Sequence, residues 1–270
     1  MRNWTLLLAL FIGLQLSAQD AEWTSIKDIN PFIGTGGHGH THPSAQAPFG
    51  MIQLGPNTRY DGWDGCSGYH YTDSAMYGFT CTHLSGTGVS DYGDLLMLPY
   101  SSPTKEGDHI KFFKEDEHAQ AGYYACILDD GTRIEATAGD RIGKLRLHFP
   151  RNSSPGIMVD LNFRDRVLKQ DFSALGAGKF EGRRISEGWA REQHFYFGFE
   201  VSPAPDSVWK LSPGVYWLSL PEGTVDAEVS IGMSGTSEKG AWTNFFGEEA
   251  FRPFEDVFTE TQEKWLKELA

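Results

Sequence analysis

The sequence predicts an all-β protein: an antiparallel β-sandwich followed by one C-terminal helix. From about residue 93 onward, short segments rich in β-branched and aromatic residues recur, and several of them alternate apolar with polar residues. The 31 glycines and 13 prolines among 270 residues supply turns between such segments and leave little room for long helices. Many short strands at close spacing are typical of two packed antiparallel sheets.

The expected strands share this composition and are bounded by turn residues. In chain order they read DLLMLPY (94–100), GYYACIL (122–128), TRIEATA (132–138), GKLRLHF (143–149), GIMVDLNF (156–163), HFYFGFEVS (194–202), GVYWLSL (214–220) and DAEVSIGM (226–233). The sequence DDGT (129–132), between the second and third, predicts a hairpin turn.

Only the last segment predicts a helix. In RPFEDVFTETQEKWLKELA (252–270) apolar residues recur about every 3.6 positions, and Pro253 suits the first turn. No glycine cap or proline stop follows, so we expect the helix to lead into a second domain whose surface would cover its apolar face. The alternative is a terminal helix that folds back on the sandwich.

The first residues are typical of a secretory signal peptide, because Arg2 precedes an apolar run that ends before Ser17 and Ala18. We therefore expect a signal peptide at 1–18, a sandwich domain at 24–250 and a truncated linker helix at 251–270. The apolar run is too short to span a bilayer, and no later segment is apolar enough. The product is expected to be exported, periplasmic or extracellular, with no membrane span.

The net charge excludes one class of partner. A net charge of −13 repels phosphate backbones, which argues against nucleic acid as a partner.

The chain has three cysteines, Cys66, Cys81 and Cys126. They allow a disulfide such as Cys66–Cys81 or three buried thiols, and the sequence does not choose between these alternatives.

The segment GWDGCSGYHYTDSAMYGFTCTHLSGTGVSDYGD (62–94) mixes aromatic, histidine, hydroxyl, aspartate and glycine residues, which indicates loops around a polar ligand. Trp63 and Tyr69 offer flat rings for the C–H face of a pyranose, and Arg59 offers a planar fork for vicinal hydroxyls. Five aspartates are candidates for the two carboxyls that glycoside hydrolysis needs, although loop aspartates usually cap turns. They are Asp61, Asp64, Asp73, Asp91 and Asp94.

Three histidines in HGHTH, His38, His40 and His42, alternate along the chain. In an extended segment they would share one face and could hold zinc with an open position for water. The alternative is that they form hydrogen bonds or face a ligand directly.

A family resemblance is carried by two long stretches, INPFIGTGGHGHTHPSAQAPFGMIQLGPNTRYDGWDGCSGYHY (29–71) and YGFTCTHLSGTGVSDYGDLLMLP (77–99). Both closely resemble the start of glycoside hydrolase family 92. The members of this family are exo-acting α-mannosidases, best represented in gut and marine Bacteroidetes. GWAREQHFYFGFEVS (188–202) and VSIGMSGTSEKGAWTNF (229–245) resemble later parts of the same N-terminal domain. The resemblance implies a supersandwich of the galactose-mutarotase type, a helical linker and an (α/α)₆ barrel that carries the catalytic carboxylates and an essential calcium. This chain looks like the sandwich alone, with no catalytic residue, cofactor or metal of its own.

The resemblance also implies that sandwich loops close over a mannose-containing glycan. Carried over to matching positions, the expected substrate-binding residues are Arg59, Trp63, Asp64, Cys66, Tyr69, His83 and Ser85. Trp63 would be the stacking platform, and Arg59, Asp64 and His83 would bind hydroxyls. The chain departs from the family pattern at Thr41–Ala45 and at Cys81, which bears on the linkage accepted.

Three hypotheses about function follow. The first is the binding half of a calcium-dependent, inverting α-mannosidase whose barrel is missing here. The second is a stand-alone carbohydrate-binding module, which predicts a covered last helix and measurable mannoside affinity. The third is a self-sufficient enzyme that uses the loop aspartates or a histidine-bound metal.

Overall fold

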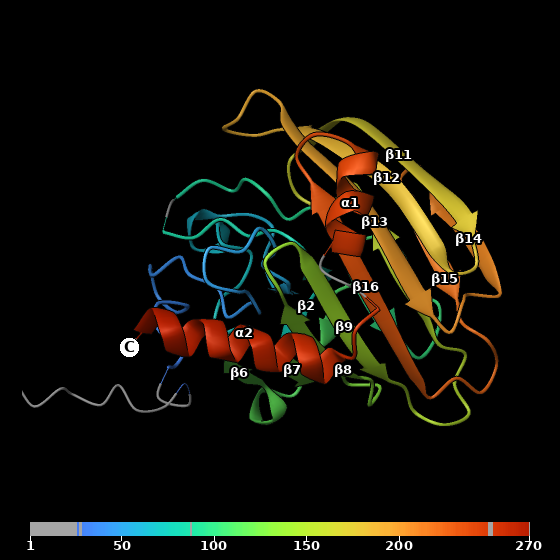
Figure 1. Ribbon diagram of the computed structural model, residues 1–270, viewed down its shortest axis with the longest axis horizontal. Coiled ribbons are helices and arrows are strands. Elements are labelled where there is room, and N and C mark those ends of the chain that lie inside the picture. Colours follow the sequence, from blue (N-terminus) through green and yellow to red (C-terminus); the bar gives the residue numbers. More distant parts are fainter. Residues whose placement is uncertain (1–25, 27–28, 87, 248–250, 270) are drawn as a thin grey trace, which may run out of the picture.

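The computed structural model describes residues 26, 29–86, 88–247 and 251–269, so the expected signal peptide at 1–18 lies outside the described residues. Two antiparallel sheets face each other and enclose one large apolar core (Figure 1). The six-stranded sheet has the order β1 (Gly55–Asn57), β3 (Gly78–Thr80), β4 (Leu96–Tyr100), β10 (Gly156–Asp160), β15 (Val215–Ser219) and β14 (Ser207–Ser212). The predicted antiparallel sandwich is confirmed.

The second sheet has eight strands and carries both α-helices on its outer face (Figure 1). Its order is β11 (Arg166–Gly176), β12 (Lys179–Glu187), β13 (Gln193–Ser202), β16 (Asp226–Ser234), β9 (Ile142–His148), β8 (Arg133–Ala138), β7 (Tyr123–Ile127) and β6 (His118–Gln120). A small ladder pairs β2 (Ala75–Met76) with β5 (Ile110–Lys111), and two short 3₁₀ turns are η2 (Trp63–Gly65) and η3 (Lys114–Asp116).

All eight predicted strands are present, as β4, β7, β8, β9, β10, β13, β15 and β16. The predicted hairpin joins β7 to β8, where the Leu128 amide donates to the Thr132 carbonyl at 2.9 Å. The sequence does not predict the short strands β1, β2, β3, β5 and β6 or the longer strands β11, β12 and β14. In β12 the inward positions include Gly182 and Arg184, so its alternation does not look apolar although these residues are buried.

The expectation of a single helix is wrong, because α1 (Glu238–Gly247) also forms. Ser237 caps its start, and the Gly240 amide donates to the Ser237 hydroxyl at 3.0 Å. Gly232 on β16 lets the helix approach closely, since a Cβ there would come within 3.0 Å of the Phe245 amide nitrogen. A glycine inside a short, weakly amphipathic segment hides this helix in the sequence.

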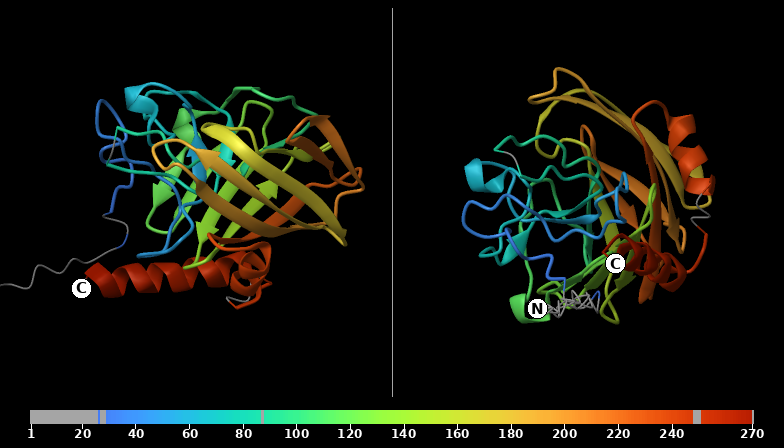
Figure 2. Two further views of the ribbon diagram at one scale, coloured as in Figure 1. Left: turned by 90° about the horizontal axis from the view of Figure 1, so that it is seen from above. Right: turned by 60° about the vertical axis from the view of Figure 1, so that its left-hand side comes forward.

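Helix α2 (Phe254–Leu269) docks on the sandwich, so the expectation that its partner surface is missing is corrected for the first part of the helix (Figure 2). Phe254, Val257 and Thr261 are buried, and the Thr261 hydroxyl donates to the Ala138 carbonyl at 2.7 Å. Near the other end, Trp265 Nε1 donates to the Gln46 carbonyl at 2.8 Å. The sandwich therefore covers the first part of the apolar stripe, whereas Leu266 and Leu269 near the end of the helix stay exposed.

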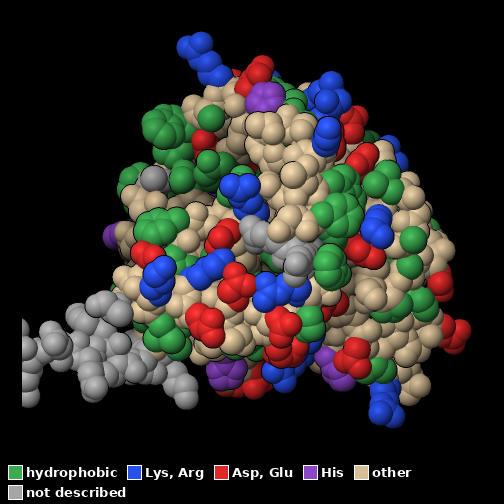
Figure 3. All heavy atoms as spheres, in the orientation of Figure 1, with side chains coloured by type: hydrophobic (Ala, Val, Ile, Leu, Met, Phe, Trp, Pro, Cys, Tyr) green, Lys and Arg blue, Asp and Glu red, His purple; other side chains and the backbone are tan. Residues whose placement is uncertain are grey.

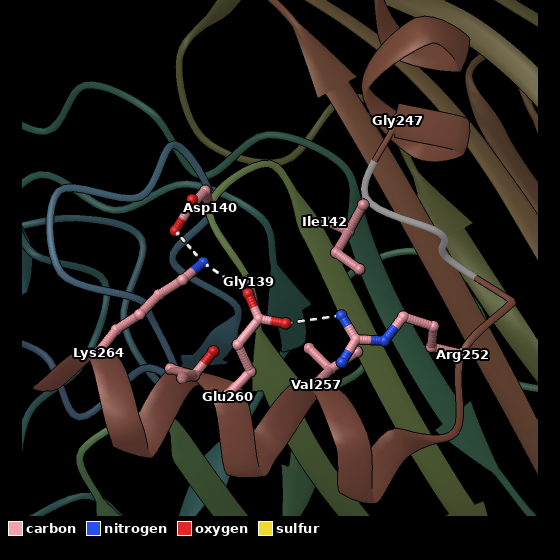
Figure 4. A pocket seen from close by; sticks show the side chains of 9 residues that line it. Gly139, Asp140, Ile142, Gly247, Arg252, Val257, Glu260 and Lys264 are labelled. Atoms are coloured by element: carbon pink, nitrogen blue, oxygen red, sulfur yellow. Dashed lines mark hydrogen bonds and ion pairs between the residues drawn. The ribbon is translucent and has the colours of Figure 1, made fainter.

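Ion pairs border this contact (Figure 4). Lys264 lies between Asp140 and Glu260, at 2.9 and 3.0 Å, and Glu260 also accepts from Arg252 at 2.6 Å. Acidic and basic side chains cover the outward face in this region, as expected for a helix half in water (Figure 3). Among the described helices none is long and apolar enough to cross a membrane.

The cysteine alternatives are settled in favour of buried thiols. Cys66, Cys81 and Cys126 are all buried, and no disulfide joins them. Burial raises the pKa of each thiol, so they behave as small apolar groups.

Candidate functional site

Loops from the first third of the chain gather at one end of the sandwich, where the C-terminal end of α2 also lies (Figures 1 and 2). Trp63 stands on η2 in this region with 62% of its surface exposed. Its ring meets the His40 ring edge-on at a centroid distance of 4.9 Å. An exposed tryptophan held against a second ring is a ready platform for a flat apolar surface.

A carboxylate and two imidazoles lie beside this platform. His38 Nδ1 is 2.6 Å from Asp64 Oδ1, and His40 Nε2 is 3.5 Å from the same oxygen. The hydrogen bond from His38 is the main cause that lowers the pKa of Asp64. Asp64 is therefore ionised at neutral pH and keeps a second oxygen for accepting hydrogen bonds.

Ser85 belongs to the same edge, and its side chain is exposed. The next residue fastens this loop, because the Gly86 amide donates to the His40 carbonyl at 2.7 Å. Gly88 lies directly against the Trp63 ring, where a Cβ would overlap it. We call the group of His38, His40, Trp63, Asp64 and Ser85 the Trp63 rim.

Arg164 holds the rim from below. Its Nη2 donates to the carbonyls of Gly65 and Cys66, at 3.1 and 2.9 Å, and to the Ser90 hydroxyl at 2.6 Å. Its backbone has φ of +63°, a conformation that non-glycine residues rarely adopt. The Arg164 guanidinium thus donates hydrogen bonds to the carbonyls of the turn that carries Trp63, and it links this turn to the segment before β11.

Three of the expected binding residues lie inside the protein. Cys66 is buried beneath η2, and Tyr69 is buried with its hydroxyl donating to Glu117 at 2.8 Å. Lys114 donates to the same hydroxyl at 2.6 Å. These groups are already satisfied, so in this arrangement they support the loops and do not present themselves at the Trp63 rim.

His83 is the third. One ring nitrogen lies 2.9 Å from the Ser67 carbonyl and the other 3.3 Å from the Gly55 carbonyl. Burial lowers its pKa to about 4, so the ring is neutral at physiological pH. His83 thus links Ser67, which follows η2, to Gly55 in β1. Its ring stacks on the His42 ring at a centroid distance of 4.7 Å.

Arg59 faces a different hollow from Trp63. Its guanidinium binds both oxygens of Asp73, with Nε–Oδ2 and Nη2–Oδ1 distances of 2.8 Å. This pairing raises the pKa of Arg59 and removes Asp73 from the set of available carboxylates. The sequence analysis expects Arg59 and Trp63 to contribute to one substrate site. In the structure Arg59 lines a hollow to which Trp63 does not contribute.

The zinc alternative for HGHTH does not match the geometry. His38 bonds Asp64, His40 lies against Trp63, and His42 stacks on His83, so the three rings do not converge on one point. Within the described ranges no group of three or more His, Cys, Asp or Glu side chains is placed to hold a metal ion.

Two further loop aspartates fasten structure. Asp91 accepts from the amides of Trp189 and Ala190, at 2.7 and 3.1 Å. Asp94 is buried and pairs with Arg184 of β12 at 2.6 Å. Among the five candidates Asp61 and Asp64 remain exposed enough to meet a ligand.

Sequence reasoning missed two residues near this end. Trp189 is 78% exposed on the loop that Asp91 holds. Asp165 has a buried oxygen without a hydrogen-bond partner, and burial raises its pKa to about 6. The motif GWAREQ contains the first, but nothing local distinguishes the second from an ordinary turn aspartate.

The fold and this loop end define a class: a two-sheet antiparallel sandwich with an aromatic and polar rim at one end. The model of the glycosyl hydrolase family 92 N-terminal domain matches residues 29–249. The chain belongs to this family, as its N-terminal sandwich domain.

Relatives and solved structures agree. A GH92 α-mannosidase from Bacteroides thetaiotaomicron superposes with a TM-score of 0.83 and 28% identity over 90% of this chain and 37% of that one. The structure of the same enzyme in complex with mannoimidazole gives 0.82 and 27%, over 89% and 36%. An uncharacterized secreted glycosidase of Arthroderma benhamiae is 29% identical over 171 residues, 57% of this chain and 22% of the relative. The chain thus spans well under half the length of these proteins.

Proposed function

We propose that this chain is the binding half of an exported α-mannosidase and that the Trp63 rim contacts a mannoside. The carrying observation is the exposed Trp63 ring beside the His38–Asp64 pair, at the loop end of a family 92 sandwich. A relative with 27% identity has been solved with mannoimidazole, which supports mannose as the sugar class.

The chemistry of the rim suits a pyranose. A sugar ring has an apolar C–H face and equatorial hydroxyls at its edge, so Trp63 would cover the face and Asp64 would accept from a hydroxyl. The His38 side chain is 80% exposed and holds one Asp64 oxygen, and the Asp64 side chain itself is 31% exposed. Ser85 adds a hydroxyl on the opposite loop.

Bond cleavage belongs to the complete enzyme. Inverting hydrolysis needs one carboxyl to protonate the leaving oxygen and a second to activate water. We assign both, together with the calcium, to the (α/α)₆ domain that the resemblance to family 92 implies. This chain would bind and orient the sugar.

A stand-alone carbohydrate-binding module is the second candidate. Helix α2 buries Phe254, Val257 and Thr261 on the sandwich, which favours this hypothesis, although the end of its apolar stripe stays exposed. The two candidates share the rim and differ in whether the isolated chain binds sugar well without a second lobe.

Calorimetric titration of the purified chain with methyl α-mannoside and mannobiose tests the rim. We expect heat at millimolar sugar, lost in Trp63→Ala and kept in Trp209→Ala, a matched control with 51% exposure on β14. Equal affinity in both variants would refute the assignment.

An activity assay separates binding from catalysis. Release of p-nitrophenol from p-nitrophenyl α-mannoside should be absent with or without calcium or zinc. Turnover that Asp64→Asn abolishes would instead establish a self-sufficient enzyme.

A further inference from the structure

A second hollow lies on the other side of the turn that carries Trp63. Its volume is about 610 Å³, within the range of small-molecule sites. We call it the Tyr60 hollow. It is lined by Thr58, Arg59, Tyr60, Asp61, Gly62, Thr72, Asp73, Ser74, Ala75, Tyr77 and His109.

Three rings form one wall. Tyr77 stacks on His109 at 4.4 Å with an interplanar angle of 16°, and Tyr60 meets Tyr77 edge-on at 5.3 Å. The β2–β5 ladder favours this stacking, because it ends at the pair of Met76 with Ile110 and the same register carried one residue further sets Tyr77 opposite His109. Phe163 supports Tyr77 from the core side at 5.6 Å.

The opposite wall is polar but has no free cation. Asp73 neutralises Arg59, and the exposed Asp61 adds a negative charge. Arg59 Nη1 and the hydroxyls of Tyr60 and Tyr77 make no hydrogen bond to a described residue, so they remain available as donors and acceptors. A phosphate, sulfate or acidic sugar would meet net negative charge, whereas a neutral polyol would find both an apolar ring wall and unsatisfied polar groups.

The hollow is formed in advance by backbone hydrogen bonds. The amides of Thr58 and Arg59 both donate to the Gly68 carbonyl, at 2.7 and 3.1 Å. The Tyr77 amide donates to the Asn57 carbonyl at 2.8 Å, and the Asp73 amide to the His70 carbonyl at 3.0 Å. A ligand would therefore pay little for ordering these segments.

The Tyr60 hollow and the Trp63 rim are neighbours along the chain, because the hollow is lined up to Gly62 and the rim begins at Trp63. Tyr60 and Trp63 are three residues apart, so their Cα atoms lie at most about 11 Å from each other. We propose that the Tyr60 hollow is a second glycan-binding site that takes a neutral sugar residue of an oligosaccharide whose other end occupies the Trp63 rim. The identity of that oligosaccharide as a mannoside rests on the proposed function; the preference for a neutral sugar does not.

The test is an amide-shift titration of the ¹⁵N-labelled chain with methyl α-mannoside and with mannotetraose. We expect the monosaccharide to shift rim amides around 38–40 and 63–64. The oligosaccharide should add shifts around 59–61, 73–77 and 109. Tyr60→Ala, which removes a half-exposed ring, should weaken mannotetraose about tenfold and leave methyl α-mannoside unchanged. Tyr60→Phe keeps the ring and should retain most of the affinity, and Trp209→Ala is the remote control.

The outcomes separate the two ideas. Rim shifts without hollow shifts, or mannotetraose affinity unchanged in Tyr60→Ala, overturn the second site and leave the proposed function intact. Hollow shifts without rim shifts support a neutral-sugar site and overturn the rim. Tighter binding of mannose 6-phosphate than of mannose at the hollow amides contradicts the neutral-ligand argument, and no shift with any sugar overturns both sites.

Discussion

Gly88 offers a way to move the Trp63 platform without removing it. A Cβ at Gly88 would have three Trp63 ring atoms within 2.7 Å, whereas ordinary contact begins at 3.4 Å. The backbone at Gly88 does not require glycine conformationally, and the obstructing atoms are the far end of an exposed side chain. Gly88→Ala should therefore push the indole aside by roughly 1 Å or more, at a stability cost within about 0.5 kcal/mol.

The consequence is for binding. Displacement of the ring should reduce mannoside affinity about tenfold, ~1.4 kcal/mol, close to the effect of Trp63→Ala. Calorimetry measures the affinity, a thermal melt checks stability, and near-ultraviolet circular dichroism follows the indole environment. If Gly88→Ala binds sugar as the wild type does while Trp63→Ala does not, Gly88 does not position the ring. If neither variant loses affinity, Trp63 is no platform.

Three further predictions concern stability, measured by urea unfolding. The buried His83 has a pKa of about 4, whereas histidine in the unfolded chain is protonated below a pH near 6.5. The free energy of unfolding should therefore be highest above pH 6.5 and fall by roughly 3 kcal/mol as the pH drops toward 4. His83→Gln should reduce this loss, and an equal loss in the variant would contradict the prediction. Arg164→Met leaves carbonyls of the η2 turn without donors and should cost about 3 kcal/mol, whereas a cost below 1 kcal/mol would mean that water replaces the guanidinium. Val257→Ala should cost about 2 kcal/mol and the exposed Leu266→Ala under 0.5 kcal/mol, and equal effects would argue against docking of α2.

Strands that alternate apolar and polar residues could be predicted from the sequence, because that period sets which side chains reach the core. Strand β12 could not be predicted because an arginine such as Arg184 normally lies at the surface. In the structure its guanidinium is buried and donates hydrogen bonds to Asp94 and to two backbone carbonyls. Helix α2 was recognised, but its partner was not, since periodicity shows that a stripe needs cover and does not say which surface covers it.

The candidate site, too, could be predicted only in part from the sequence. Composition located the loops and identified Trp63 and Asp64, whose exposure is consistent with a binding role. Composition could not tell that Tyr69 and His83 point inward, because a polar aromatic residue suits a ligand contact and a buried hydrogen bond equally well. The pairing of Arg59 with Asp73 could not be predicted for a similar reason, because it depends on how residues 59 and 73 are brought together in the fold.

Arg164 and Arg184 have a consequence beyond geometry. Surface loops commonly open on their own, with amide hydrogens that exchange long before the global unfolding event. Here two guanidiniums anchor the loop end to the segment before β11 and to β12 itself, through carbonyls at 65 and 66 and through Asp94. Local opening would expose these charges without their acceptors, so the loops and the sheet should lose their order in one cooperative transition.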